Sequence, residues 1–134
     1  MKEKVKILIW APFVSKVGTV NNVINSAYSL LKFSKSKKFE ISLVNCIGEW
    51  EEYKKDLFDK GLNVINFFNL KLFNKFKKEG FIKSRLAYVY IFLVSFFPLF
   101  RYLKKEKPDF LNAYLVTSLP LVLFSLFNFR TKLI

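Results

Sequence analysis

The chain has 134 residues, a formal net charge of +13 at neutral pH and 52% hydrophobic residues, with 17 Phe among them. This length is enough for one domain with its own core, and this composition excludes a disordered chain. One cysteine and no histidine exclude an internal disulfide framework and remove the usual general base and the commonest metal ligand. We therefore expect no metal site. We interpret Cys46, inside the apolar run ISLVNCI, as a buried hydrophobe rather than a reactive thiol.

The first part of the chain predicts a strand, a loop and a helix. Residues 5–11, VKILIWA, form a short apolar run ended by Pro12, which indicates a strand buried on both faces. Beyond the loop, apolar residues recur at helical spacing from Val20 to Leu31 with polar residues between them, so we expect an amphipathic helix. Thr19 precedes this pattern and is a credible N-cap.

Residues 39–46 and 62–67 are expected to be the second and third strands. Between them, residues 48–61, GEWEEYKKDLFDKG, predict a charged helix that is closed by Gly61. Two successive strand–helix–strand units imply right-handed crossovers. The sequence therefore predicts a parallel, doubly wound sheet.

The regular alternation of strands and helices is then interrupted. Residues 71–85 are basic with interspersed Phe and Leu, whereas residues 86–100 contain no charge and only one Ser. A helix over residues 86–100 is roughly 22 Å long, which is shorter than the roughly 30 Å hydrocarbon core of a bilayer, and Pro98 disfavours a straight span. We expect a helix that is buried or dips into a membrane interface, with a spanning helix as the alternative.

The last part of the chain returns to the strand–helix–strand pattern. Residues 109–114, DFLNAY, predict a fourth strand, and residues 130–134, RTKLI, predict a fifth. The helix between them has Thr117 or Ser118 as its cap and Pro120 in its first turn, where the missing N–H costs little. Because the sequence stops inside the fifth strand, we expect an incomplete domain.

The positive charge is concentrated in one internal segment, because residues 71–107 carry ten Lys or Arg and two Glu. Basic residues on both sides of an apolar helix suit peripheral binding to an anionic membrane. A core helix with a solvated fringe of lysines explains the same pattern, and so does a small membrane protein anchored by residues 86–103. A module that binds nucleic acid also fits the charge, but no helix-turn-helix, RRM or zinc pattern is present, so no nucleic acid is expected. The candidates for the membrane surface are Lys75, Lys77, Lys78, Arg85, Arg101 and Lys104.

Three stretches resemble, in order and spacing, the N-terminal domain of GT-B glycosyltransferases of the family 4 type. Residues 6–32, KILIWAPFVSKVGTVNNVINSAYSLLK, are similar to the first strand, glycine loop and first helix of that family. Residues 104–114, KKEKPDFLNAY, resemble its Lys-Pro-Asp lead-in to an apolar strand. Residues 115–134 are similar to the helix and strand that follow. The likeness covers almost the whole chain.

The resemblance implies a Rossmann-like, doubly wound parallel sheet that is the incomplete N-terminal half of a GT-B glycosyltransferase. Residues 1–134 are then a truncated, acceptor-side domain, and the C-terminal, donor-binding domain is absent from them. The implied function is transfer of a sugar from a nucleotide-sugar donor to a surface-glycan or lipid-linked acceptor, in the cytoplasm at the inner face of the cytoplasmic membrane. No cofactor is implied, and we expect this half to be inactive alone.

Two groups of candidate site residues follow. The loop of residues 11–19 ends at a helix N-terminus, where backbone N–H groups favour anions and Gly18 allows close approach. No G-x-G-x-x-G or P-loop pattern is present, so a plain strand–helix connection is the alternative. Many relatives have a Gly-Gly pair in this loop and a histidine at the end of the fourth strand, where this chain has Asn112 and Tyr114, which can hydrogen-bond a sugar hydroxyl. The phosphate-loop candidates are Ser15, Lys16, Gly18 and Thr19, the acceptor-side candidates are Asn112 and Tyr114, and no catalytic residue is identified.

Overall fold

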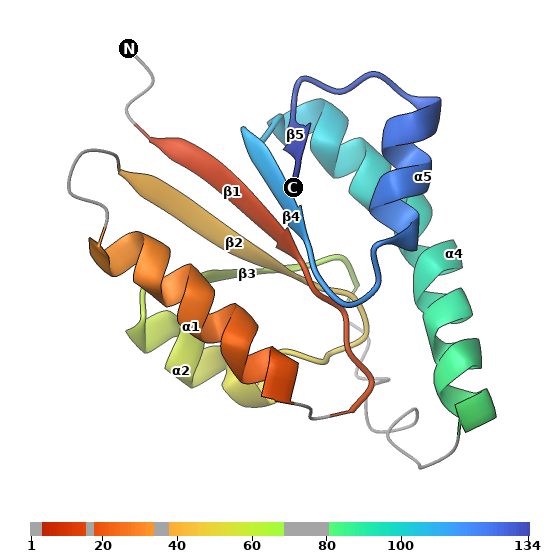
Figure 1. The fold of residues 1–134 in the computed structure, drawn as a ribbon, viewed down its shortest axis with the longest axis horizontal. Helices are drawn as coiled ribbons and strands as arrows, with labels where there is room; N and C mark the ends of the chain where they lie inside the picture. Colours follow the sequence, from red (N-terminus) through yellow and green to blue (C-terminus); the bar gives the residue numbers. More distant parts are fainter. Residues whose placement is uncertain (1–3, 16–17, 34–37, 69–80) are drawn as a thin grey trace.

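The computed structural model describes residues 4–15, 18–33, 38–68 and 81–134. Its centre is a five-stranded sheet in the order β3-β2-β1-β4-β5, in which every neighbouring pair is parallel (Figure 1). The strands are β1 (Val5–Trp10), β2 (Phe39–Asn45), β3 (Asn63–Asn66), β4 (Phe110–Ala113) and β5 (Lys132–Leu133). The predicted parallel sheet is confirmed, and the α/β architecture is consistent with a Rossmann-like fold.

Strand β1 lies at the centre and pairs with β2 on one edge and β4 on the other. Ile7 is opposite Ile41 of β2 and Phe110 of β4, and Ile9 is opposite Leu43 and Asn112. A parallel sheet is normally covered on both faces, so its central strand reads as a continuous apolar run. The burial of every β1 residue from Ile7 onward agrees with this rule.

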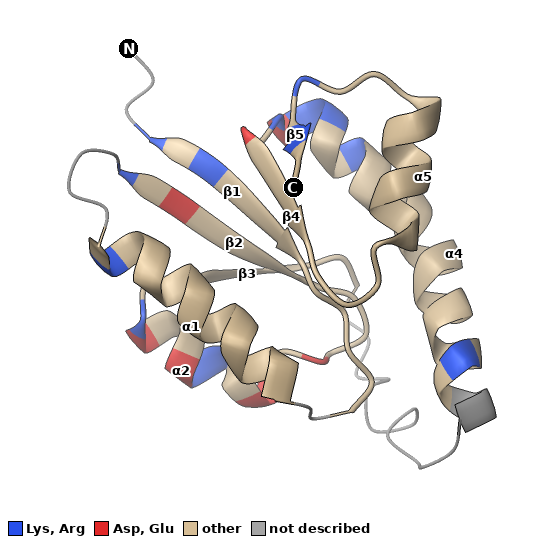
Figure 2. Ribbon diagram, in the orientation of Figure 1, with Lys and Arg blue, Asp and Glu red and all other residues tan. Residues whose placement is uncertain are grey.

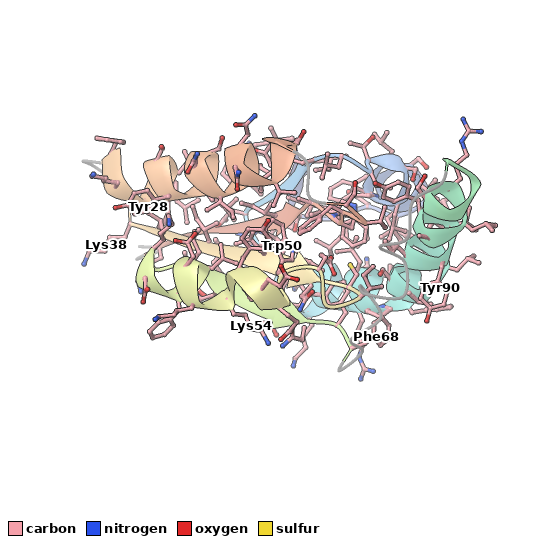
Figure 3. The ribbon with its side chains drawn as sticks, turned by 90° about the horizontal axis from the view of Figure 1, so that it is seen from below. Tyr28, Lys38, Trp50, Lys54, Phe68 and Tyr90 are labelled. Atoms are coloured by element: carbon pink, nitrogen blue, oxygen red, sulfur yellow. The ribbon has the colours of Figure 1, made fainter. Side chains whose placement is uncertain are left out.

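The helices form two pairs beside the sheet. Helices α1 (Gly18–Phe33) and α2 (Lys54–Asp59) are neighbours. Lys60, which caps the end of α2, has its Nζ atom 6.0 Å from the ring centre of Tyr28 in α1. Helices α4 (Phe81–Glu106) and α5 (Ser118–Leu126) contact each other at the other end of the sheet (Figure 1). In Figure 3 side chains fill the space between these helices and the sheet, and Trp50 lies in the interior.

The first predicted helix is confirmed in extent, but its predicted cap is wrong. Val20, Val23, Ile24 and Ala27 are buried, as the apolar spacing predicts. The helix begins at Gly18, so Thr19 lies inside the first turn and is not the residue that precedes it. Helix ends are fixed by local backbone geometry, which the apolar pattern alone does not specify.

The predicted helix over residues 48–61 is confirmed in part, because it begins later than predicted and starts as a 3-10 turn. Residues 46–50 form a buried loop, followed by a short 3-10 turn, η1 (Glu51–Tyr53), and then by the six residues of α2. The predicted closure by Gly61 is confirmed: its φ is 73°, its N–H donates to Phe58 O at 2.9 Å, and Leu62 N–H donates to Leu57 O at 2.8 Å. These two bonds form a Schellman motif, which requires the left-handed conformation at Gly61.

The helix predicted over residues 86–100 is longer than expected. It has 26 residues, is about 39 Å long at 1.5 Å per residue, and contains Pro98 in its interior. Figure 1 shows α4 changing direction part of the way along its length. Because proline has no N–H, the carbonyl of Val94 loses its helical partner, which is a common cause of such bends. Among the described residues, the segment Ser84–Glu106 is the one helix that is long and apolar enough to cross a membrane.

We predict that Gly61→Ala lowers the free energy of unfolding by about 1–2 kcal/mol, because a side chain in the left-handed region is strained. A Cβ atom at this position would lie 3.9 Å from Leu31 Cδ1, so steric overlap adds nothing. Gly61→Asn should lose less, since Asn tolerates this conformation. Urea denaturation of the three proteins measures the effect, and equal stability of the Ala variant would contradict the assigned role of Gly61.

Candidate functional site

The candidate site lies where the chain leaves β1 and β4 in opposite directions. After β1 the chain passes through α1 to β2, whereas after β4 it passes through α5 to β5. In open parallel sheets the loops diverge at such a switch point, and ligands bind outside the carboxyl ends of the strands there. The N-termini of α1 and α5 both follow these strand ends (Figure 1). The structure therefore brings the described residues of the predicted phosphate loop and the end of β4 to the same side of the sheet, at the carboxyl ends of the strands.

The loop after β1 is held by its own apolar residues. Phe13 is 1% exposed and its ring meets Trp50 edge-to-face, with 4.9 Å between ring centres. Such an aromatic contact adds to the area that both rings bury. Ser15, at the end of this fixed segment, is exposed. Lys16 lies outside the described residues.

The start of α1 presents backbone and small side chains to solvent. Gly18 and Thr19 are both exposed. A Cβ atom on Gly18 would meet no described atom within 4 Å, and Gly18 is not among the glycines with positive φ. The open space at Gly18 would allow a ligand to approach the backbone closely at this position.

The loop after β4 is tied to β1 by two hydrogen bonds. Trp10 Nε1 donates to Val116 O at 2.6 Å, and Tyr114 N–H donates to Trp10 O at 2.7 Å. Thr117 is the N-cap residue of α5, and its side chain makes no capping hydrogen bond in the described structure. Thr117 and Ser118 are both exposed. The sequence predicts one of these two residues as the cap of the helix, and the fold also places both at the candidate site.

The two acceptor-side candidates occupy different positions. Asn112 lies inside β4, and its Oδ1 atom is buried without a hydrogen-bond partner among the described residues. Tyr114 follows the end of the strand and is partly exposed. The structure therefore places Tyr114 at the carboxyl ends of the strands, whereas Asn112 Oδ1 is buried beside β4. Their contact with an acceptor stays a prediction.

A buried polar loop that the sequence pattern does not predict follows β2, beside the candidate site. Glu49 is 1% exposed, and its carboxylate accepts the N–H of Cys46 at 3.0 Å and of Ile47 at 2.8 Å. Asn45 closes the same loop, because its Oδ1 accepts the N–H of Gly48 at 3.1 Å. The feature of the sequence that corresponds to this loop is the presence of two polar residues, Asn45 and Glu49, in the otherwise apolar run ISLVNCIGEW. The sequence predicts Glu49 in the charged helix over residues 48–61, whereas it lies in the loop before that helix.

Burial raises the pKa of the Glu49 carboxyl from 4.5 to about 7, although the N–H groups of Ile47 and Cys46 act in the opposite direction. The pKa of the Cys46 thiol lies well above its usual range. Burial is the largest cause, and the negative charge of Glu49 is the second. The thiol is therefore neutral at physiological pH. The prediction that Cys46 is a buried hydrophobe is confirmed by its complete burial.

The described basic candidates lie on α4. Arg85, Arg101 and Lys104 are exposed, whereas Lys75, Lys77 and Lys78 lie outside the described residues. Figure 2 shows Lys and Arg toward both ends of α4, with an uncharged stretch between them. Lys104 also has a structural role, because its Nζ donates to Asn128 O at 3.4 Å and lies 5.4 Å from the ring centre of Phe129.

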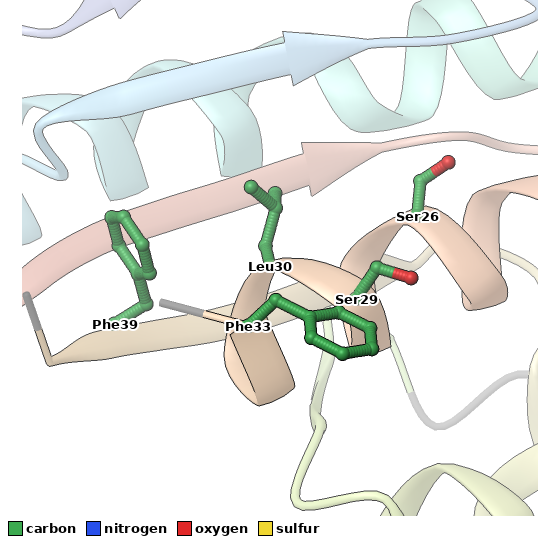
Figure 4. A pocket seen from close by; sticks show the side chains of 5 residues that line it. All are labelled: Ser26, Ser29, Leu30, Phe33 and Phe39. Atoms are coloured by element: carbon green, nitrogen blue, oxygen red, sulfur yellow. The ribbon is translucent and has the colours of Figure 1, made fainter. Parts of the chain in front are cut away.

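Two grooves lie away from the switch point, toward the starts of the strands. One of about 550 Å³ (Figure 4) is lined by Ser26, Ser29, Leu30, Phe33 and Phe39. Another of about 510 Å³ is lined by Lys4, Lys6, Glu40, Glu106, Lys107, Asp109 and Arg130. The first contains no charged group, and the second mixes both signs. On chemical grounds, neither suits a phosphate as well as two helix N-termini do.

No family model, curated protein or solved structure matches the chain. Among the described residues, no group of three potential metal-ligating side chains is present.

We predict that the wild-type protein loses stability as pH rises from about 5 to about 8. Because the pKa of Glu49 is raised, the folded state binds the proton of this carboxyl more tightly than the unfolded state does. The contribution of Glu49 to the free energy of unfolding is therefore fully present below the unfolded-state pKa and is lost as pH rises through about 7. Its size is on the order of 3 kcal/mol. Urea denaturation at several pH values measures the change.

Glu49→Gln is the matched variant for this measurement. One amide oxygen can replace Oε2, which accepts from both Cys46 and Ile47, while the longer bond from Cys46 N–H to Oε1, at 3.1 Å, is lost. The variant should have a flatter stability profile than the wild type and should be the more stable protein near pH 8. Parallel profiles for the two proteins would show that Glu49 does not titrate in this range.

Proposed function

We propose that this chain is the acceptor-side, Rossmann-like domain of a GT-B glycosyltransferase of the family 4 type. The reaction is transfer of a sugar from a nucleotide-sugar donor to a surface-glycan or lipid-linked acceptor. The observation that carries the proposal is the pair of helix N-termini, with exposed hydroxyl side chains, at the switch point of a parallel sheet.

The chemistry of this edge supports binding of a phosphorylated sugar. Helix N-termini offer unpaired N–H groups and a partial positive charge, which favour phosphate oxygens. Hydroxyl groups both donate and accept hydrogen bonds, as sugar hydroxyls do. The exposed hydroxyl residues at this edge are Ser15, Thr19, Thr117 and Ser118.

The resemblance supports a division of labour between two domains. The described residues contain one parallel sheet of a Rossmann-like kind. The GT-B fold has two such domains, and the family holds the donor mainly on the second. In this proposal the present domain contacts the acceptor and the donor phosphate, and a second domain grips the nucleotide. The chain has no histidine to act as a general base.

Amide chemical shifts test where ligands bind. The probes are inorganic phosphate, uridine diphosphate and a short-chain polyprenyl diphosphate sugar, each titrated into the isotopically labelled protein. Shift changes are expected at Ser15, Gly18, Thr117 and Ser118. Changes confined to Leu30 and Phe33, which line the apolar groove, would overturn this site, and so would the absence of changes with all three probes.

We predict that Gly18→Ala weakens binding of the phosphorylated probe about tenfold without loss of stability. The added methyl group occupies the space in which a ligand meets the backbone. Ala has a higher helix propensity than Gly by roughly 0.5–1 kcal/mol inside a helix, and at this first helical position the gain should be smaller. Ser29→Ala, an exposed change near the other end of α1, is the control and should change neither quantity. Unchanged affinity for Gly18→Ala would contradict the role of this helix N-terminus.

We also predict that residues 1–134 alone transfer no sugar from common nucleotide-sugar donors, because the donor-gripping half of the fold is not among them. Product formation from radiolabelled donors, measured against a control without protein, tests this. Turnover above the control would contradict the division into two domains.

A further inference from the structure

Helix α4 has two different faces. On one side every fourth residue is buried: Ala87, Ile91, Ser95, Leu99 and Leu103. On the other side Leu86, Val89, Leu93 and Phe97 are 63%, 55%, 65% and 75% exposed. Their spacing of three, four and four residues places these side chains in one row along the helix. We call these four residues the α4 stripe.

The exposed apolar surface continues from α4 to the end of α5. Phe100 lies one turn beyond Phe97, and its ring centre is 4.7 Å from that of Phe127. Phe127 is 36% exposed and its neighbour Leu126 is 64% exposed. Soluble proteins rarely leave large contiguous apolar patches uncovered, and such patches usually mark an interaction site.

The charges around the α4 stripe are positive. Arg85 precedes Leu86, and Arg101 follows Phe97 by one turn on the exposed side. Lys104 and Lys105 extend this positive end, and no charged residue lies between Arg85 and Arg101 (Figure 2). Glu106, the one acidic residue of α4, lies beyond the stripe and contacts Lys105 at 3.6 Å.

This charge distribution disfavours a second copy of the chain as the partner. If two α4 stripes paired in parallel, Arg85 would meet Arg85 and Arg101 would meet Arg101. If they paired antiparallel, Arg85 would meet Arg101. Either arrangement brings like charges together in a chain whose net charge is already +13, and such contacts are costly.

The buried face of α4 disfavours a membrane-spanning role. A spanning helix is surrounded by lipid or by other spanning elements. Residues such as Ile91 and Leu99 are instead fully buried in the same core as the sheet. The helix can therefore present only its exposed side to a membrane, with its axis near the plane of the surface.

We infer that the α4 stripe binds the surface of a membrane that contains anionic phospholipids. The stripe enters the boundary between headgroups and acyl chains, to a depth of roughly 5–10 Å. Arg101 and Lys104 then lie at the level of the phosphates, where each basic residue adds to the attraction. This inference rests on α4 and α5 alone, and it does not depend on glycosyl transfer.

Vesicle co-sedimentation tests this inference. The protein should bind vesicles of phosphatidylglycerol and phosphatidylcholine but not vesicles of phosphatidylcholine alone. Raising salt from 0.1 M to 1 M shortens the Debye length from about 10 Å to about 3 Å and should release most of the protein. Lack of binding to either vesicle overturns the inference. Retention that salt does not reverse overturns it in favour of a spanning helix.

Single substitutions identify the surface that binds. Leu93→Ser and Phe97→Ser should each lower the partition coefficient about tenfold, and Arg101→Gln should lower it about fivefold. Phe58→Ser is the matched control, because Phe58 is 80% exposed on α2 and should leave partitioning unchanged. Equal effects of Phe97→Ser and Phe58→Ser overturn the assignment. A change from dimer to monomer in Leu93→Ser, measured by light scattering, overturns it in favour of a second copy.

Fluorescence quenching by brominated lipids measures the depth of insertion. The two native tryptophans, Trp10 and Trp50, are fully buried and should not be quenched. Phe97→Trp should be quenched by vesicles with brominated acyl chains, whereas Phe58→Trp should not. Quenching of both variants, or of neither, contradicts insertion of the α4 stripe.

Discussion

Strand β1 carries hydrogen bonds on both edges and apolar packing on both faces, and the other elements are arranged around these two demands. Two parallel neighbouring strands cannot be joined by a tight turn. The connections that lead to β2 and to β4 must therefore be helices or long loops. The crossover through α1 leads away on one side, and the chain after β4 leads away on the other. The diverging loops at the switch point are therefore a consequence of how the central strand is paired.

Hydrogen bonds and a ring contact connect the described parts of the loops at the carboxyl ends of the strands. The indole of Trp10, at the end of β1, holds the carbonyl of Val116 after β4, while Phe13 packs against Trp50 after β2. Asn45 links the loop after β2 to β3, because its Nδ2 donates to Asn66 Oδ1 at 2.8 Å. These contacts hold the described residues after β1, β2 and β4 close to one another, next to the starts of α1 and α5.

Apolar periodicity predicted the strands and α1 well, because burial of these elements depends mainly on the alternation of residue types. It did not predict the ends of α4, since the predicted range of residues 86–100 covers only the uncharged middle of a helix that runs from Phe81 to Glu106. It also could not reveal the environment of Glu49, because the N–H groups that hold this carboxylate become available only when β2 ends in a tight loop. At the candidate site, the loop pattern in the sequence is enough to make Ser15 and Gly18 candidates. Thr117 and Ser118 become candidates for the site only when the three-dimensional order of the strands is known.

One edge of the sheet is formed by β3, which has only four residues. Its first and last residues, Asn63 and Asn66, are exposed, and Asn66 is engaged by the side chain of Asn45. Long, flat, apolar edge strands recruit strands from other molecules, whereas short edges with polar residues recruit them poorly. In a chain in which more than half of the residues are hydrophobic, this short polar border helps to keep concentrated protein from assembling edge to edge into fibrous aggregates.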